Sequence, residues 1–144
     1  MINRELIDPK SIVVVGGSNN VHKPGGRLVR NLLDGKYKGE LYVVNAREDD
    51  VQGLKSYHSV QDIPDTEMAI ISIPGPSCPE AVDILAKQKN VKAFIVVSAG
   101  FGEETHEGAI LENQMLDSVN EAGASMIGPN CIGLMNMNFH GVFT

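Results

Sequence analysis

The chain alternates short apolar runs with longer segments in which apolar residues recur every three or four positions. The short runs favour strands, and the richest in valine and isoleucine are typical of parallel strands that are buried on both faces. The pattern predicts strands at 11–16, 41–45, 68–73, 93–97 and 125–127.

Helical spacing follows the first, third and fourth of these runs. Proline at position 79 suits the first turn of a helix, and glycines end the other two helices near positions 35 and 123. The segment 47–65 is polar and is expected to be irregular, anchored by Val51, Leu54 and Tyr57. The predicted helices carry Leu28, Val29, Leu32 and Leu33; Ala81, Val82, Ile84 and Leu85; and Ile110, Leu111, Met115, Leu116 and Val119.

Strands that alternate with helices predict an α/β fold with a Rossmann-like, doubly wound parallel sheet, because each parallel crossover needs a connecting helix. No internal repeat or linker interrupts the pattern, so we expect residues 1–144 to form a single domain. In such sheets, ligands bind beyond the carboxyl ends of the strands.

Composition narrows the class of protein. The 144 residues are 42% apolar and 21% charged, which is typical of a globular domain, and the net charge is −6. Scattered basic residues argue against nucleic acid, and the short apolar runs argue against a membrane span. Cys78 and Cys131 have no metal-site or disulfide spacing, so we expect reduced thiols, no metal and a cytoplasmic location.

Glycine, serine, asparagine or proline ends or directly follows every predicted strand. The loop 16–26 joins a strand to a helix, so its backbone N–H groups can cradle a phosphate, with Lys23 as an added charge. It is neither a Walker A loop nor a clean GxGxxG motif. The loop therefore indicates nucleotide binding without indicating which nucleotide.

The second strand leads into Asn45-Ala46-Arg47. At this place, a domain that binds NAD usually has an acidic residue that hydrogen-bonds the ribose hydroxyls. Arg47 suits a phosphate on the adenosine ribose, as in NADP or coenzyme A, because guanidinium pairs with phosphate oxygens. The alternative is that Arg47 is a solvated charge offset by Glu48 and Asp49.

The fifth strand leads into Gly-Pro-Asn-Cys-Ile-Gly at 128–133. Proline fixes its own φ and the flanking glycines allow tight turns, so this segment can present Asn130 and Cys131 at fixed positions. The alternative is that this segment is a structural turn that binds no ligand.

Together these motifs carry a resemblance that spans about residues 7–136. The chain resembles the CoA-binding domain at the N-terminus of ADP-forming acyl-CoA synthetases, and is similar to the alpha subunit of succinyl-CoA synthetase. Its specific motifs are Ser-Ala-Gly-Phe at 98–101 and Gly-Pro-Asn-Cys at 128–131, preceded by Gly-Gly-Ser at 16–18, Arg-Asn-Leu at 30–32, Val-Asn at 44–45 and Asp-Ile-Pro at 62–64.

The resemblance implies a reversible ligase that converts acyl-CoA, phosphate and ADP into acid, CoA and ATP through an acyl phosphate and a phosphohistidine. In the family, the phosphohistidine and ATP-grasp domains follow or lie on another subunit, so these 144 residues would hold only the CoA part. The domain alone is then expected to be inactive, with the remaining synthetase domains or subunit as partners. No residue matches the family's histidine, and surface positions are expected for His22, His58, His106 and His140.

The resemblance also implies roles for single residues in binding CoA. Its phosphates would lie against the first loop and Lys23, and its ribose phosphate against the second strand, where the family often has Asn-Pro-Lys. The passage toward the thiol would follow the later loops. The implied contacts are Gly16, Gly17, Ser18, Asn19 and Lys23; Asn45 and Arg47; Ile73 and Pro74; Ser98, Ala99, Gly100 and Phe101; and Asn130 and Cys131.

Some alternatives stay open. Phe101 suits packing as well as ligand contact, and Cys131 suits a packed thiol better than a nucleophile, since nothing nearby in the sequence lowers its pKa. For the whole chain, the alternatives are a stand-alone CoA-binding or redox-sensing module, and an NAD(P)-binding oxidoreductase domain. The sequence indicates neither the acyl substrate nor the nucleotide.

Overall fold

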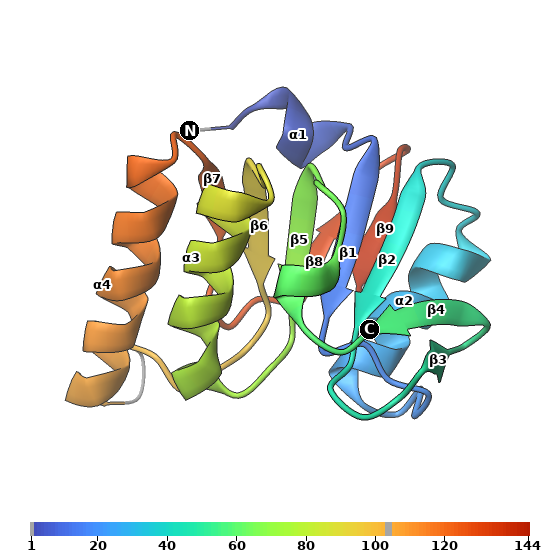
Figure 1. The fold of residues 1–144 in the computed structure, drawn as a ribbon, viewed down its shortest axis with the longest axis horizontal. Coiled ribbons are helices and arrows are strands. Elements are labelled where there is room, and N and C mark those ends of the chain that lie inside the picture. The colour runs from blue at the N-terminus through green and yellow to red at the C-terminus, as the bar shows by residue number, and fades with distance from the viewer. Residues whose placement is uncertain (1, 103–104) are drawn as a thin grey trace.

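A computed structural model of the chain describes residues 2–102 and 105–144. Its centre is a seven-stranded sheet in the order β3-β4-β2-β1-β5-β6-β7, and a separate two-stranded sheet is formed by β8 and β9 (Figure 1). The strands are β1 Ser11–Val15, β2 Glu40–Val44, β3 Asp50–Val51, β4 Leu54–Tyr57, β5 Met68–Ile71, β6 Ala93–Val96, β7 Ser125–Ile127, β8 Gly133–Met135 and β9 His140–Val142. The helices are α1 Arg4–Ile7, α2 Pro24–Asp34, α3 Cys78–Gln88 and α4 His106–Glu121, with 3-10 turns η1 Val60–Asp62 and η2 Gly75–Ser77.

Six strands run parallel, and the short edge strand β3 pairs antiparallel with β4. The register aligns Val15 of β1 with Val44 of β2 on one side and with Ile71 of β5 on the other. These three strands therefore end at the same level. This is the Rossmann-like, doubly wound α/β fold that the sequence predicts.

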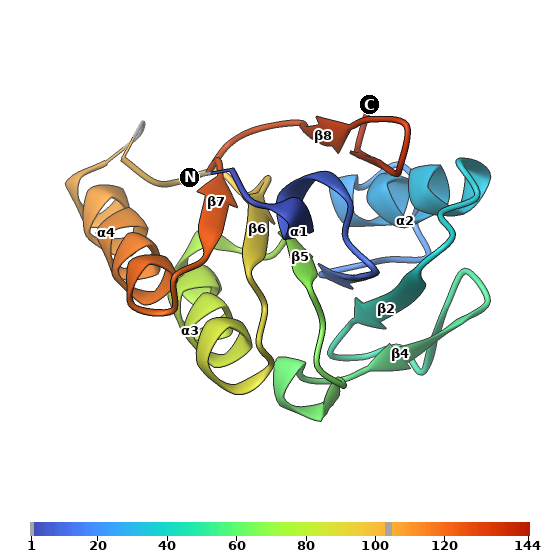
Figure 2. The same cartoon turned by 90° about the horizontal axis from the view of Figure 1, so that it is seen from above.

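Two hydrophobic cores cover the two faces of the sheet, because successive residues of a strand point to opposite sides. In β1, Val13 and Val15 pack with α3 and α4, whereas Ile12 and Val14 pack with α2 and Phe139. Figure 2 shows α3 and α4 on one face, and α2 with β8 on the other. Because both faces are covered, β5 and β6 carry apolar residues at every position, and β1 does so after Ser11.

The segment 47–65, expected to be irregular, forms β3, β4 and η1. The expectation was wrong because β3 has only two residues, too few for a visible alternation. Val51, one of the expected anchors, is fully buried. In α4, Ile110 and Leu116 lie on the exposed face, although their spacing suits a helix.

The sequence pattern did not predict the hairpin of β8 and β9. It crosses to α2, where Asn31 donates a hydrogen bond from Nδ2 to the Val142 carbonyl (2.8 Å). Phe139, between the two strands, is 2% exposed and joins the core beneath α2. A single buried aromatic in a polar segment gives no periodicity, which is why the hairpin was missed.

Gly16 brings the end of β1 close to both neighbouring strands. Its N–H donates to the Val44 carbonyl (2.8 Å), and its φ is 93°. A Cβ on Gly16 would collide with the Ser72 carbonyl, where β5 ends. The glycine is therefore required for both its backbone conformation and the space it leaves.

We predict that Gly16→Ala lowers the free energy of unfolding by about 3 kcal/mol, since strain at positive φ adds to a collision with backbone. Gly53→Ala is the matched control. It also has positive φ, at 89°, but nothing lies within 4 Å of its Cβ position, so it should lose only about 1 kcal/mol. Urea denaturation measures both, and equal losses would contradict the close approach.

Candidate functional site

The carboxyl ends of the parallel strands meet at one edge of the sheet, and the loops that leave them form the candidate site (Figure 1). Each of the five segments predicted to bind a ligand follows one of these strands. The predicted contacts lie at 16–19 and 23 after β1, at 45 and 47 after β2, at 73–74 after β5, at 98–101 after β6 and at 130–131 after β7.

The first loop folds tightly onto the start of α2. A Cβ on Gly25 would collide with the Gly16 carbonyl, and one on Gly26 with the Asn20 carbonyl. Lys23 is the N-cap residue and makes no side-chain cap bond. Pro24 has no N–H, so the N–H groups that the first turn leaves without a capping side chain are those of Gly25 and Gly26. This arrangement gives an anion a positive helix end and, from Lys23, an exposed ammonium group.

Asn45 ties the loop after β2 to the first loop. Its Nδ2 donates to the Gly17 carbonyl (2.8 Å), and its Oδ1 accepts from the N–H groups of Arg47 (2.9 Å) and Glu48 (3.0 Å). The Asn45 amide thus shapes the turn that carries Arg47. The Arg47 side chain is exposed, and Asp49 contacts His58 (2.8 Å) instead.

Gln52, which no sequence motif indicates, lies in the turn between β3 and β4 and binds the first loop. Its Nε2 donates to the Ser18 and Gly26 carbonyls, both at 2.9 Å, and its N–H donates to Asn19 Oδ1 (2.7 Å). Asn19 in turn donates from Nδ2 to the Asp50 carbonyl (2.9 Å). No pattern along the chain distinguishes this glutamine, because its partners are 26 to 34 residues away.

Ser98 ties together the loops after β5, β6 and β7. Its hydroxyl donates to the Ile73 carbonyl (2.6 Å) and accepts from the Ile73 N–H (3.1 Å). Its own carbonyl accepts from the N–H of Asn130 (2.9 Å), which has a φ of 57° and follows a cis peptide bond at Gly128-Pro129. The Ser98 hydroxyl therefore positions neighbouring loops as well as lying at the edge of the site.

The remaining predicted contacts differ in exposure. Pro74, Ala99 and Asn130 are exposed, and Ile73 and Gly100 are partly buried. The Phe101 side chain is fully buried in the core on the side of α3 and α4. The sequence allowed Phe101 either a packing role or a ligand contact, and the structure shows that it packs in the core.

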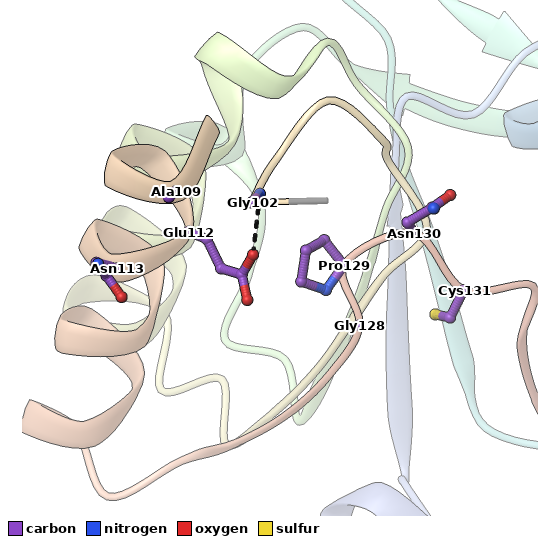
Figure 3. A pocket seen from close by; sticks show the side chains of 8 residues that line it. All are labelled: Gly102, Ala109, Glu112, Asn113, Gly128, Pro129, Asn130 and Cys131. Carbon is purple, nitrogen blue, oxygen red and sulfur yellow. Dashed lines mark hydrogen bonds between the residues drawn. The ribbon is translucent and has the colours of Figure 1, made fainter. Parts of the chain in front are cut away.

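A cavity of about 750 Å³, widely open to solvent, lies between the Pro129 turn and α4. Figure 3 shows the Pro129 ring facing the Glu112 carboxylate, whose Oε1 accepts a hydrogen bond from the Gly102 N–H (3.2 Å). Asn130 and Cys131 lie on the side of Pro129 away from α4. Pockets of this size take small-molecule ligands, and the α4 side of this one was not foreseen from the sequence.

The two thiols are held by packing. Burial raises the pKa of Cys131, and its Sγ donates to the Val96 carbonyl (3.3 Å). Burial also raises the pKa of Cys78. Both directions oppose thiolate formation, which favours the packed thiol over a nucleophile at Cys131.

All four histidines are exposed, as predicted from the sequence: His22, His58, His106 and His140. Within residues 2–102 and 105–144, no group of three His, Cys, Asp or Glu side chains could hold a metal ion. Among the helices of the described chain, none has the length and apolar character needed to cross a membrane.

Loops at this edge of a doubly wound sheet are typical of nucleotide-binding domains, and comparison with known proteins gives the family of this one. Residues 10–137 match the model of the CoA binding domain. The chain belongs to this family, and coenzyme A is its ligand.

Relatives of known activity are much longer than this chain. It is 41% identical over 134 residues to acetate–CoA ligase (ADP-forming) II of Archaeoglobus fulgidus, covering 92% of this chain and 20% of that protein. It is 38% identical over 133 residues to the alpha subunit of acetate–CoA ligase (ADP-forming) II of Pyrococcus furiosus, covering 91% and 28%. The chain therefore spans less than a third of either relative.

Solved structures agree with this fold. The crystal structure of PH0766 from Pyrococcus horikoshii OT3 has a TM-score of 0.90 at 38% identity, over 99% of this chain and 33% of that one. The apo dinucleotide-forming acetyl-coenzyme A synthetase 1 of Ca. Korarchaeum cryptofilum has a TM-score of 0.89 at 31% identity, over 97% and 31%. The chain thus matches the CoA-binding domain of the ADP-forming acyl-CoA synthetase family.

We predict that Gln52→Glu lowers the free energy of unfolding by about 2 kcal/mol and weakens CoA binding. The substitution puts an acceptor where two carbonyl oxygens need a donor. Gln61→Glu is the matched control, since Gln61 is exposed in η1, and its change should stay within about 0.5 kcal/mol. Equal effects of the two variants in urea denaturation and calorimetry would show that Gln52 does not hold the loop.

We predict that iodoacetamide modifies Cys131 more slowly than free cysteine at pH 8, because its raised pKa leaves less thiolate. The rate should keep rising as the pH passes the pKa of free cysteine. Mass spectrometry of the peptides separates Cys131 from Cys78. A Cys131 rate above that of free cysteine at pH 7 would identify an activated thiol instead.

Proposed function

We propose that this domain holds CoA along the carboxyl edge of the sheet, with its adenosine end near Arg47 and its thiol end near the Pro129 turn. We further propose that it is the CoA-binding part of an ADP-forming acyl-CoA ligase. The observation that carries the first proposal is the set of five loops along one edge, which hydrogen bonds join to one another.

The width of the sheet matches the length of the pantetheine arm. Neighbouring strands lie about 4.8 Å apart, so the three steps from β1 through β5 and β6 to β7 span about 14 Å. About twelve bonds join the phosphate oxygen of CoA to its sulfur, which gives a reach of roughly 13–14 Å at the rise of an extended peptide. With its phosphate at the first loop, the arm would bring the thiol to the turn after β7.

Two cationic side chains support the proposed position of the adenosine end of CoA. Lys23 and Arg47 are both exposed, on the loops after β1 and β2. The chain as a whole carries −6, so an anion needs local positive charge and helix N–H groups. The guanidinium of Arg47 suits the ribose phosphate of CoA, with which it can form paired hydrogen bonds.

The names of the relatives support the ligase proposal. They include ADP-forming ligases of acetate and of 4-hydroxybutyrate. In the complete protein, acyl-CoA, phosphate and ADP would give the acid, CoA and ATP. We assign the phosphohistidine and nucleotide steps to other synthetase domains or a partner subunit, and propose a cytoplasmic location in keeping with the free thiols of Cys78 and Cys131.

NADP is the competing ligand, because it also carries a phosphate on the adenosine ribose and also suits Arg47. Dephospho-CoA lacks that phosphate but keeps the pantetheine arm. Comparing the three ligands therefore separates recognition of the ribose phosphate from recognition of the arm.

We predict that the chain binds CoA more tightly than dephospho-CoA or NADP in calorimetry. Arg47→Ala should weaken CoA binding about tenfold, because it removes charge-assisted hydrogen bonds to the ribose phosphate, and should leave dephospho-CoA binding unchanged. Arg30→Ala is the control, since Arg30 pairs with Asp34 (2.9 Å) along α2. NADP binding without CoA binding would contradict the proposed CoA site.

A further inference from the structure

The cavity beside the Pro129 turn extends past the point where the CoA thiol would arrive. It continues from Pro129 to α4 and is lined there by Ala109, Glu112 and Asn113, together with Gly102 of the loop after β6. The first loop and Arg47 do not line it, so it takes no part in holding the phosphates. Its volume, about 750 Å³, leaves room for more than the sulfur.

One carboxylate and no cation lines this cavity in the described part of the chain. Glu112 is partly buried on α4, and its Oε1 is held by the Gly102 N–H (3.2 Å). The other lining residues are glycine, alanine, proline, asparagine and cysteine. A second carboxylate brought into this space would lie near a like charge, with no lysine, arginine or histidine of the lining to offset it.

We propose that this cavity is the acyl chamber of the CoA site, and that Glu112 makes it select uncharged acyl groups over those that carry a carboxylate. The inference rests on the proposed function, because the acyl group is carried on the CoA sulfur. The pantetheine arm reaches the Pro129 turn, and the acyl group continues from there toward α4.

The bond between Glu112 and Gly102 keeps the negative charge directed into the chamber. In Figure 3 the carboxylate stands between α4 and the Pro129 ring, and so faces the space that the acyl chain would enter. Glutamine at this position would keep an oxygen acceptor for the Gly102 N–H and lose the charge. The substitution therefore separates the charge from the structural role of the side chain.

Calorimetric titration of the purified chain with CoA, butyryl-CoA and succinyl-CoA tests the inference. Butyryl and succinyl groups have the same number of carbons and differ in a terminal carboxylate. The chain should bind butyryl-CoA more tightly than succinyl-CoA. Glu112→Gln should tighten succinyl-CoA binding about three- to tenfold, the effect of one nearby charge at a dielectric close to that of water, and leave CoA and butyryl-CoA unchanged.

Glu107→Gln is the matched control, because Glu107 is exposed in the first turn of α4 and does not line the cavity. It should leave the preference between the two acyl groups unchanged. Ala109→Leu, a second variant, should weaken butyryl-CoA at least threefold while CoA binding stays the same, since it fills the chamber. Gln114→Leu, exposed on the same helix, is its control.

The outcomes separate the inference from the proposed function. If CoA binds and neither Glu112→Gln nor Ala109→Leu changes the relative affinities of the acyl-CoAs, the inference that the cavity holds the acyl group is wrong. The proposed CoA site is then unaffected. Equal changes in Glu112→Gln and Glu107→Gln also overturn it, because they would reflect net charge alone. If no CoA binds to the unaltered chain, the proposed function fails, and the chamber fails with it.

Discussion

The site depends on the common level at which the parallel strands end, and on the hydrogen bonds that then join the loops. The Gly16 N–H reaches the Val44 carbonyl at 2.8 Å, and the Ser72 N–H reaches the Val15 carbonyl at 2.8 Å. The Ser98 hydroxyl, bonded to both backbone groups of Ile73, continues this connection toward β7. Because the loops are joined before a ligand arrives, binding need not order them separately, which favours affinity.

Several residues that look like ligand contacts in the sequence also hold the site together. The Asn45 amide makes three hydrogen bonds within the protein, and the Ser98 hydroxyl makes two. Their substitution would therefore disturb the loops even without any contact to CoA. Arg47 and Lys23 are different, because their charged groups are exposed and directed by loops that other residues shape. Recognition of the phosphates would fall to these cations and to backbone N–H groups.

The sheet and its connecting helices could be predicted from sequence, because each central strand has at least four consecutive apolar residues and each long helix has a buried stripe. The loops could be placed for the same reason, since a parallel sheet brings its carboxyl ends to one edge. The hydrogen bonds from Gln52 to the Ser18 and Gly26 carbonyls could not be predicted, because a bond between distant segments leaves no periodic signal in the sequence. The same is true of the cavity, which joins Glu112 to Pro129 across two segments.

Backbone amide chemical shifts, followed during titration with CoA, would locate the binding site on the domain. The largest shifts should fall in 16–23, 45–48, 73–75, 98–101 and 128–131, where β1, β2, β5, β6 and β7 end. The opposite edge, at 8–10, 64–67 and 90–92, should change little. Shifts concentrated at that opposite edge, or spread evenly over the chain, would contradict a CoA site at the carboxyl ends of the strands.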